Sequence, residues 1–157
     1  MENAFLAGFA SLMLAATLSA PALALTVGGV YVPDTYTANS TELQLNGAGT
    51  RSKFFIDLYV GSLYVPKAEH DGNAVVDADE PSIQSEIDQF MSVFKEEIKA
   101  GDVFDLVYVP GEGVKVFKNS EQKGTVGDLK FKKALFGIWL SDEPAQKSLK
   151  KKMLGQG

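Results

Sequence analysis

The sequence predicts a single domain of the α+β class. β-prone segments fill most of residues 26–65 and return over 103–118 as a hairpin, so strands come in runs and do not alternate with helices. Helical periodicity appears over 82–99, from residue 128 to 140 and after Pro144. The chain has 157 residues and is 45% hydrophobic, which is enough for one core.

The first 24 residues (1–24) are predicted to be a secretory signal peptide. Ala4 to Leu18 is an apolar run of the usual length, and Ala22-Leu23-Ala24 is an A-x-A cleavage site. The run is too short to span a bilayer comfortably. The start lacks the basic residue typical of a leader, and a buried N-terminal helix is the alternative. We therefore expect a periplasmic or secreted domain over 25–157, with no stable membrane span after cleavage.

Strands are expected over 26–32, 42–45 and 54–65. Gly47 and Gly49 are expected to form a bend before the last of these, because glycine accepts positive φ. Side chains alternate across a strand, so two faces follow from the spacing. One is apolar, with Phe54, Ile56, Leu58 and Val60, and the other holds Arg51, Lys53, Asp57 and Tyr59.

The clearest helix is expected over Ser82–Lys99, with Ser82 as its cap and apolar residues at spacings of three and four: Ile83, Ile87, Phe90, Met91, Phe94 and Ile98. Strands over 103–109 and 114–118 are joined through a Pro-Gly-Glu-Gly turn, and 119–127 is expected to be a turn-rich connection. Asp128 is expected to cap a helix that buries Phe131, Leu135, Ile138 and Trp139. A last helix buries Leu149, Met153 and Leu154.

Composition narrows the function classes. The chain has no cysteine, so disulfides and thiolate chemistry are excluded. A net charge of −5, with no basic block before the tail, argues against a nucleic-acid partner. We find no metal-ligand spacing, nucleophile elbow or phosphate loop, and therefore expect no cofactor.

Arg51 is the main candidate for a binding residue. Its guanidinium cannot be neutralised, so burial at the root of an apolar strand demands an anionic or carbonyl partner. One interpretation is a ligand anion held beside the open glycines. The other is a structural arginine that bridges backbone carbonyls.

Three segments together are similar to the chalcone isomerase-like family, and closest to its bacterial branch. They are Leu45 to Pro66 (LNGAGTRSKFFIDLYVGSLYVP), the hairpin region with Lys99 to Val103 (KAGDV) and Tyr108 to Gly113 (YVPGEG), and Ala134 to Leu140 (ALFGIWL), and the terminal Ser148-Leu149-Lys150 with Leu154-Gly155 fits too. The resemblance covers most of residues 26–157. It implies an open antiparallel sheet with helices packed on one face and a ligand cleft between them.

The resemblance also implies roles for two residues. In plant chalcone isomerases the arginine that matches Arg51 holds the phenolate or developing charge, and in fatty-acid-binding members it meets a carboxylate. Tyr59 falls at or near the position where the plant enzymes carry a strand threonine that orders a catalytic water. In this chain Tyr59 is expected either to donate a hydrogen bond beside Arg51 or to pack its ring at the rim of the site.

Two departures weaken the isomerase interpretation. The family carries a strand and a pair of helices after the turn that here ends at Pro81, so this chain is shortened in the middle. The enzymes also need a tyrosine and an asparagine from the middle helices, and residues 66–106 hold no tyrosine and only Asn73.

We expect an exported, non-catalytic domain that binds a small apolar carboxylate or phenolic ligand, of fatty-acid type, at Arg51 and Tyr59. The alternatives are an isomerase, in which Arg51 stabilises oxyanion charge, and a structural protein that acts through partner contacts.

Overall fold

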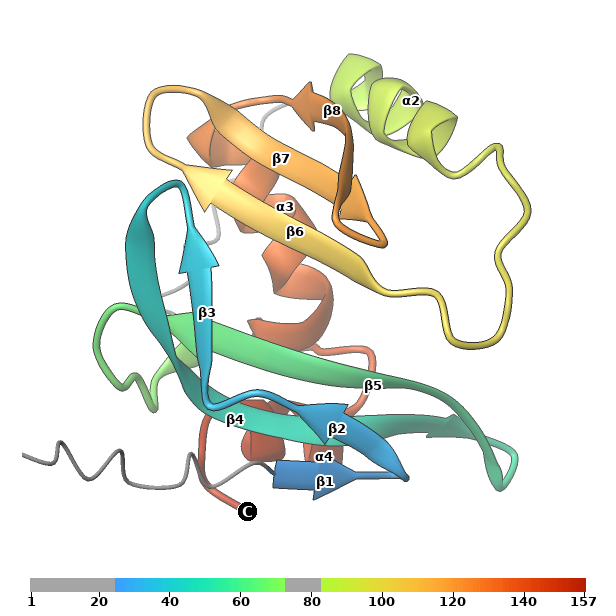
Figure 1. The fold of residues 1–157 in the computed structure, drawn as a ribbon, viewed down its shortest axis with the longest axis vertical. Coiled ribbons are helices and arrows are strands. Elements are labelled where there is room, and N and C mark those ends of the chain that lie inside the picture. Colours follow the sequence, from blue (N-terminus) through green and yellow to red (C-terminus); the bar gives the residue numbers. More distant parts are fainter. Residues whose placement is uncertain (1–24, 73–82) are drawn as a thin grey trace, which may run out of the picture.

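The computed structural model describes residues 25–72 and 83–157. These residues form three antiparallel sheets and three helices (Figure 1), so the α+β class with open antiparallel sheets is confirmed. The strands are β1 (Leu25–Val27), β2 (Val30–Val32), β3 (Thr35–Ala38), β4 (Thr41–Lys53), β5 (Ile56–Val65), β6 (Phe104–Val109), β7 (Gly113–Lys118) and β8 (Glu121–Val126). The helices are α2 (Gln84–Val93), α3 (Leu129–Leu140) and α4 (Lys147–Met153). The predicted signal peptide, 1–24, lies outside the described residues.

The prediction of a single strand over 26–32 is wrong. The chain turns back at Gly28 and Gly29, whose φ angles are 55° and 79°, and β1 pairs with β2 as a small hairpin. Glycine adopts such angles more readily than residues that carry a Cβ. This hairpin lies against the larger sheet β3–β4–β5, with Gly28 next to Thr50 and Val60.

The prediction of a bend at Gly47 and Gly49 is also wrong. Both lie inside β4, a continuous strand of 13 residues, and neither has positive φ. They are needed because α4 packs directly on the strand: a Cβ on Gly49 would stand 2.8 Å from Cδ of Lys152. The irregularity lies instead at a bulge beside Asn46, whose side-chain amide donates to the carbonyl oxygens of Glu69 and Met153.

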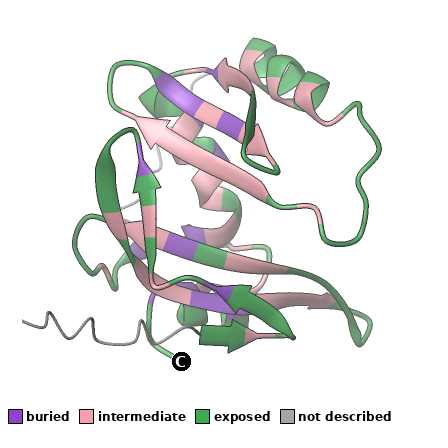
Figure 2. Ribbon diagram, viewed as in Figure 1, coloured by how far each residue is buried: buried purple, intermediate pink, exposed green. Residues whose placement is uncertain are grey.

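The turn between β4 and β5 is made of Phe54 and Phe55, so the long strand begins two residues later than predicted. The expected apolar face is exposed: Ile56 and Leu58 retain 65% and 54% of their accessible surface. The β4–β5 hairpin extends beyond the helices, and its end is almost entirely exposed (Figures 1 and 2).

The second sheet, β6–β7–β8, confirms the predicted strands over 103–109 and 114–118 to within a residue. It also contains β8, which the sequence analysis assigned to a turn-rich connection. β8 is polar, with sequence EQKGTV, but its backbone pairs with β7 from Glu121 to Val126.

Helix α2 is shorter than the predicted 82–99, and the expected cap Ser82 lies outside the described residues. The helix ends at Val93, and the N–H of the next residue, Phe94, donates to the carbonyl oxygen of Met91. The rings of Phe90 and Phe94 lie 4.8 Å apart, and Phe90 reaches Phe131 of α3. This aromatic contact holds α2 at the edge of the second sheet, beside β8 (Figure 1).

Helix α3 begins as predicted. The carboxylate of Asp128 accepts from the N–H groups of Lys130 and Phe131, which the first turn otherwise leaves unpaired. Phe131 and Leu135 are buried, but Ile138 is exposed, against expectation.

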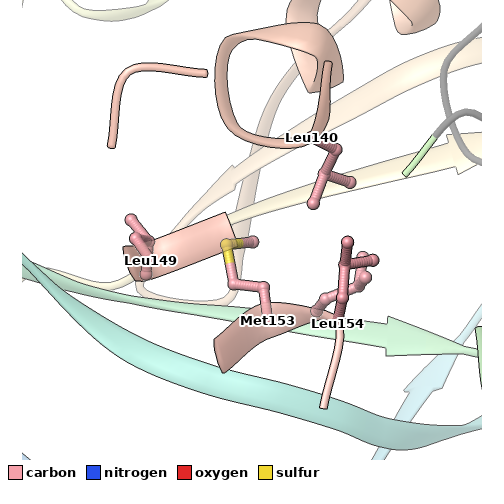
Figure 3. Packing of buried hydrophobic residues seen from close by; sticks show 5 residues of the cluster. Leu140, Leu149, Met153 and Leu154 are labelled. Atoms are coloured by element: carbon pink, nitrogen blue, oxygen red, sulfur yellow. The ribbon is translucent and has the colours of Figure 1, made fainter. Parts of the chain in front are cut away.

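Two core clusters hold the molecule together. The first contains Leu63, Leu140, Leu149, Met153 and Leu154, and Figure 3 shows side chains of α3 and α4 pointing toward one another. The second contains Val114, Val126, Phe131 and Leu135. Phe136 and Trp139 of α3 pack against both clusters. The predicted burial of Leu149, Met153 and Leu154 is confirmed.

Candidate functional site

Arg51 lies on the face of β4 that α4 covers. Its Nη1 donates to Oε1 of Gln146 at 2.9 Å and to the carbonyl oxygen of Ser52 at 3.3 Å. Gln146 precedes α4 and also accepts from the N–H of Ser52. The guanidinium is therefore half-buried where strand and helix meet, and part of it serves a structural role.

The remaining edge of the guanidinium is formed by Nε and Nη2. Among the described residues, the hydrogen bonds of Arg51 use Nη1 only, and no carboxylate forms an ion pair with it. Nε and Nη2 together make the planar fork that binds a carboxylate with two parallel hydrogen bonds.

Tyr59 stands directly opposite Arg51 in the β4–β5 register, on the neighbouring strand and not further along the same strand as the alternation pattern assumed. Its phenol oxygen accepts a hydrogen bond of 2.8 Å from Nε1 of Trp139 in α3. Because the indole N–H is a donor only, the O–H of Tyr59 is left to donate elsewhere. Sequence reasoning missed Trp139 and Gln146, which lie 80 and 95 residues from their partners.

Open space beside Gly47 and Gly49, on which the sequence argument for a ligand partly depended, is not present. The backbone and side chain of Lys152 occupy it. Tyr59, which stands opposite Arg51, remains 43% exposed.

A second site that the sequence analysis missed is a cleft of about 460 Å³ between β3 and the second sheet. Asp105 and Lys115 line it from β6 and β7, and Tyr36 from β3. Burial raises the pKa of Asp105, although the hydrogen bond from Tyr36 partly opposes this. Burial and the neighbouring carboxylate raise the pKa of Tyr36 to about 12. A carboxylate inside the apolar run FDLVYV was the available signal.

A third cluster surrounds Asp102, beside a polar cleft of about 430 Å³. The Asn119 amide donates to Asp102 at 2.9 Å, as does the N–H of Lys99, and Lys118 lies 3.3 Å away. These donors, that of Asn119 foremost, lower the pKa of Asp102 to about 2. The cluster fastens the loop before β6 to the β7–β8 turn.

Two further properties concern the part of the chain that the structure describes. No group of three or more His, Cys, Asp or Glu side chains is placed there to hold a metal ion. No helix there has the length and apolar character that crossing a membrane requires.

The fold and site together define an α+β domain whose sheet presents an arginine–tyrosine pair beneath two helices. The sequence profile of the chalcone isomerase-like family matches residues 24–84 and 78–155. The chain therefore belongs to the chalcone isomerase-like family. The match comes in two pieces that meet within 78–84, where the shortening was predicted. No curated protein matches the chain.

Proposed function

We propose that the chain is an exported, non-catalytic domain that binds a small apolar molecule with a carboxylate or phenolate group at Arg51. The observation that carries the proposal is the half-buried Arg51, which forms hydrogen bonds through Nη1 and no ion pair with a carboxylate among the described residues. A charge kept at this depth is costly without a counter-ion, and an anionic ligand supplies one.

The neighbours of Arg51 suit such a ligand. Tyr59 stands opposite with an O–H hydrogen to donate, since its oxygen already accepts from Trp139. The indole ring of Trp139 offers an apolar surface next to these polar groups. A ligand with an acidic head and an apolar body matches this combination.

Thermal shift measurements test the proposal. Decanoate should raise the melting temperature of the wild type, because a ligand selective for the folded state stabilises it, whereas decanol should have little effect. Arg51→Lys should weaken the decanoate response by removing the fork, and Arg51→Leu should abolish it. Tyr59→Phe should reduce it.

Gln146→Ala is the matched control. This substitution removes the structural partner of Arg51 and leaves the guanidinium in place. The variant should therefore melt at a lower temperature without ligand, but decanoate should still raise its melting temperature. A wild type indifferent to decanoate, together with Arg51→Leu and Gln146→Ala variants that are equally destabilised, would show Arg51 to be structural. That outcome would favour a partner-binding protein.

We also propose export to the periplasm or outside the cell. The family match starts at residue 24, where the predicted leader ends. Protein recovered from a bacterial periplasm should begin at Leu25 on N-terminal sequencing. Intact Met1 in a soluble cytoplasmic pool would contradict this.

A further inference from the structure

Three two-residue turns in this chain share one backbone geometry. Asn39–Ser40 has φ angles of 49° and 64°, Asn119–Ser120 has 51° and 69°, and Phe54–Phe55 has 51° and 66°. Asparagine is a preferred residue in such hairpin turns, whereas a bulky residue at positive φ is a genuine outlier. The geometry of the turn therefore does not account for two phenylalanines at 54 and 55.

Both rings are displayed to solvent. Phe54 and Phe55 are 82% and 106% exposed, more than any other large apolar residue among those described. They form the outermost point of the β4–β5 hairpin, which projects away from the helices (Figures 1 and 2). Strained backbone that holds apolar side chains in water is typical of a functional contact.

The shape of this tip argues against a second copy of the chain as the occupant. Edge pairing along β5 would meet the bulge at Leu58, where Arg51 pairs with Tyr59 but Ser52 pairs with Asp57, and bulges protect edge strands from pairing. The two phenyl rings alone offer roughly 150–250 Å² each, which is below the ~800 Å² that each partner of a stable protein interface buries, and the exposed Ile56 and Leu58 add to that area.

The charged side chains near the Phe54–Phe55 tip favour a lipid surface as its binding partner. Lys53 precedes the turn, with its ammonium 5.5 Å from the ring centre of Phe54. Exposed Lys147 follows Gln146, which contacts Ser52 at the base of the tip. Asp57, which accepts from the Ser52 hydroxyl at the base of the tip, offsets one of these two positive charges.

We propose that the Phe54–Phe55 tip is a membrane-docking element. Its two rings enter the headgroup boundary of an anionic bilayer, while Lys53 and Lys147 contact lipid phosphates. This inference is independent of the ligand proposed for Arg51, because it concerns the end of the hairpin and requires no bound molecule.

Vesicle co-sedimentation tests the inference. Wild type should bind vesicles of phosphatidylcholine and phosphatidylglycerol more strongly than pure phosphatidylcholine vesicles. The double variant Phe54→Asn/Phe55→Gly installs the residues that this turn geometry prefers, so the fold should be as stable or firmer. Its partition coefficient should nevertheless fall at least about tenfold, because two rings no longer enter the bilayer.

Controls isolate each contribution. Ile98→Ser removes an apolar side chain that is 59% exposed elsewhere on the surface, and it should leave binding unchanged. Lys53→Glu should weaken binding to anionic vesicles only. Wild type and variants are prepared with the same N-terminus, so any contribution of residues 1–24 cancels.

Two outcomes would overturn the inference. One is equal vesicle binding by wild type and Phe54→Asn/Phe55→Gly. The other is a wild-type dimer in gel filtration that the double variant converts to a monomer while vesicle binding is retained, which would make the tip a self-association surface.

Discussion

Gly47 lies against the backbone of Lys152: a Cβ built on Gly47 would stand 1.9 Å from the carbonyl oxygen of that residue. The atom in the way belongs to the backbone of α4 and not to a flexible side chain. The first core cluster, which contains Leu149 and Met153 of α4, thus depends on the absence of a side chain at one position of β4.

Gly47→Ala should therefore destabilise the fold by about 3 kcal/mol, since α4 must move to admit the methyl group. Gly137→Ala is the control, because its Cβ would meet only Cβ of Ser141, at 3.8 Å. Alanine inside α3 should stabilise by about 0.5–1 kcal/mol. Chemical denaturation measures both, and similar values for the two variants would contradict the packing argument.

Leu140 and Leu129 allow a second comparison within one helix. Leu140 is 1% exposed in the first core cluster, and Leu129 is 47% exposed at the start of α3. Leu140→Ala should cost about 2–5 kcal/mol through lost burial and the cavity left behind. Leu129→Ala should change the free energy of unfolding by less than about 0.5 kcal/mol.

Asp105 should make stability fall as pH rises. Its pKa is raised in the folded state by burial, so the folded chain retains this proton better than the unfolded chain. Stability is lost as pH rises from the ordinary value of 3.8 through the folded pKa. Asp105→Asn should raise the melting temperature at pH 7 and have little effect at pH 3. A gain of equal size at both pH values would contradict this assignment.

Asp102 should act in the opposite sense. Its pKa is about 2 in the folded state, against 3.8 ordinarily, so the carboxylate stabilises the fold above pH 3.8 and loses this effect as pH falls toward 2. Asp102→Ala should lower the melting temperature at pH 7 and have little effect at pH 2. Asp142→Ala is the control, because this carboxylate is 83% exposed and lies 3.8 Å from Lys150. Its loss should hardly be measurable.

Cyclisation of a chalcone should proceed near the rate of the uncatalysed reaction, because residues 66–106 supply no tyrosine. Absorbance of the chalcone over time measures this directly. Turnover far above background that Arg51→Ala abolishes would restore the isomerase alternative.

The sequence predicted the elements whose causes are local. Asp128 caps α3 through donors two and three residues away, and the β6–β7 hairpin follows from its own turn. These features depend on neighbours in sequence. Arg51 and Tyr59 were grouped on one face of a single strand, but they lie on neighbouring strands and meet through cross-strand pairing after the turn at Phe54 and Phe55.

The errors concern features fixed from far along the chain. Gly47 was interpreted as a bend because glycine permits one, but the cause is Lys152, 105 positions later. Trp139 and Gln146 join the site through contacts across the whole fold. Phe54 looked like strand because phenylalanine favours strands, and β8 was overlooked because its polar side chains carry little apolar signal.

The sharing of the first core cluster between the two ends of the chain has a consequence for dissecting the protein. Leu63 from the early strands is covered by Leu140, Leu149, Met153 and Leu154 from the last two helices. A fragment ending at residue 72 would thus expose the face of the β3–β4–β5 sheet that carries Leu63. A fragment starting at residue 83 would expose the apolar face of α4. Expressed as separate chains, the two pieces should therefore associate through this cluster, and α4 should pack only in the complex, although the second core cluster lies within the later piece.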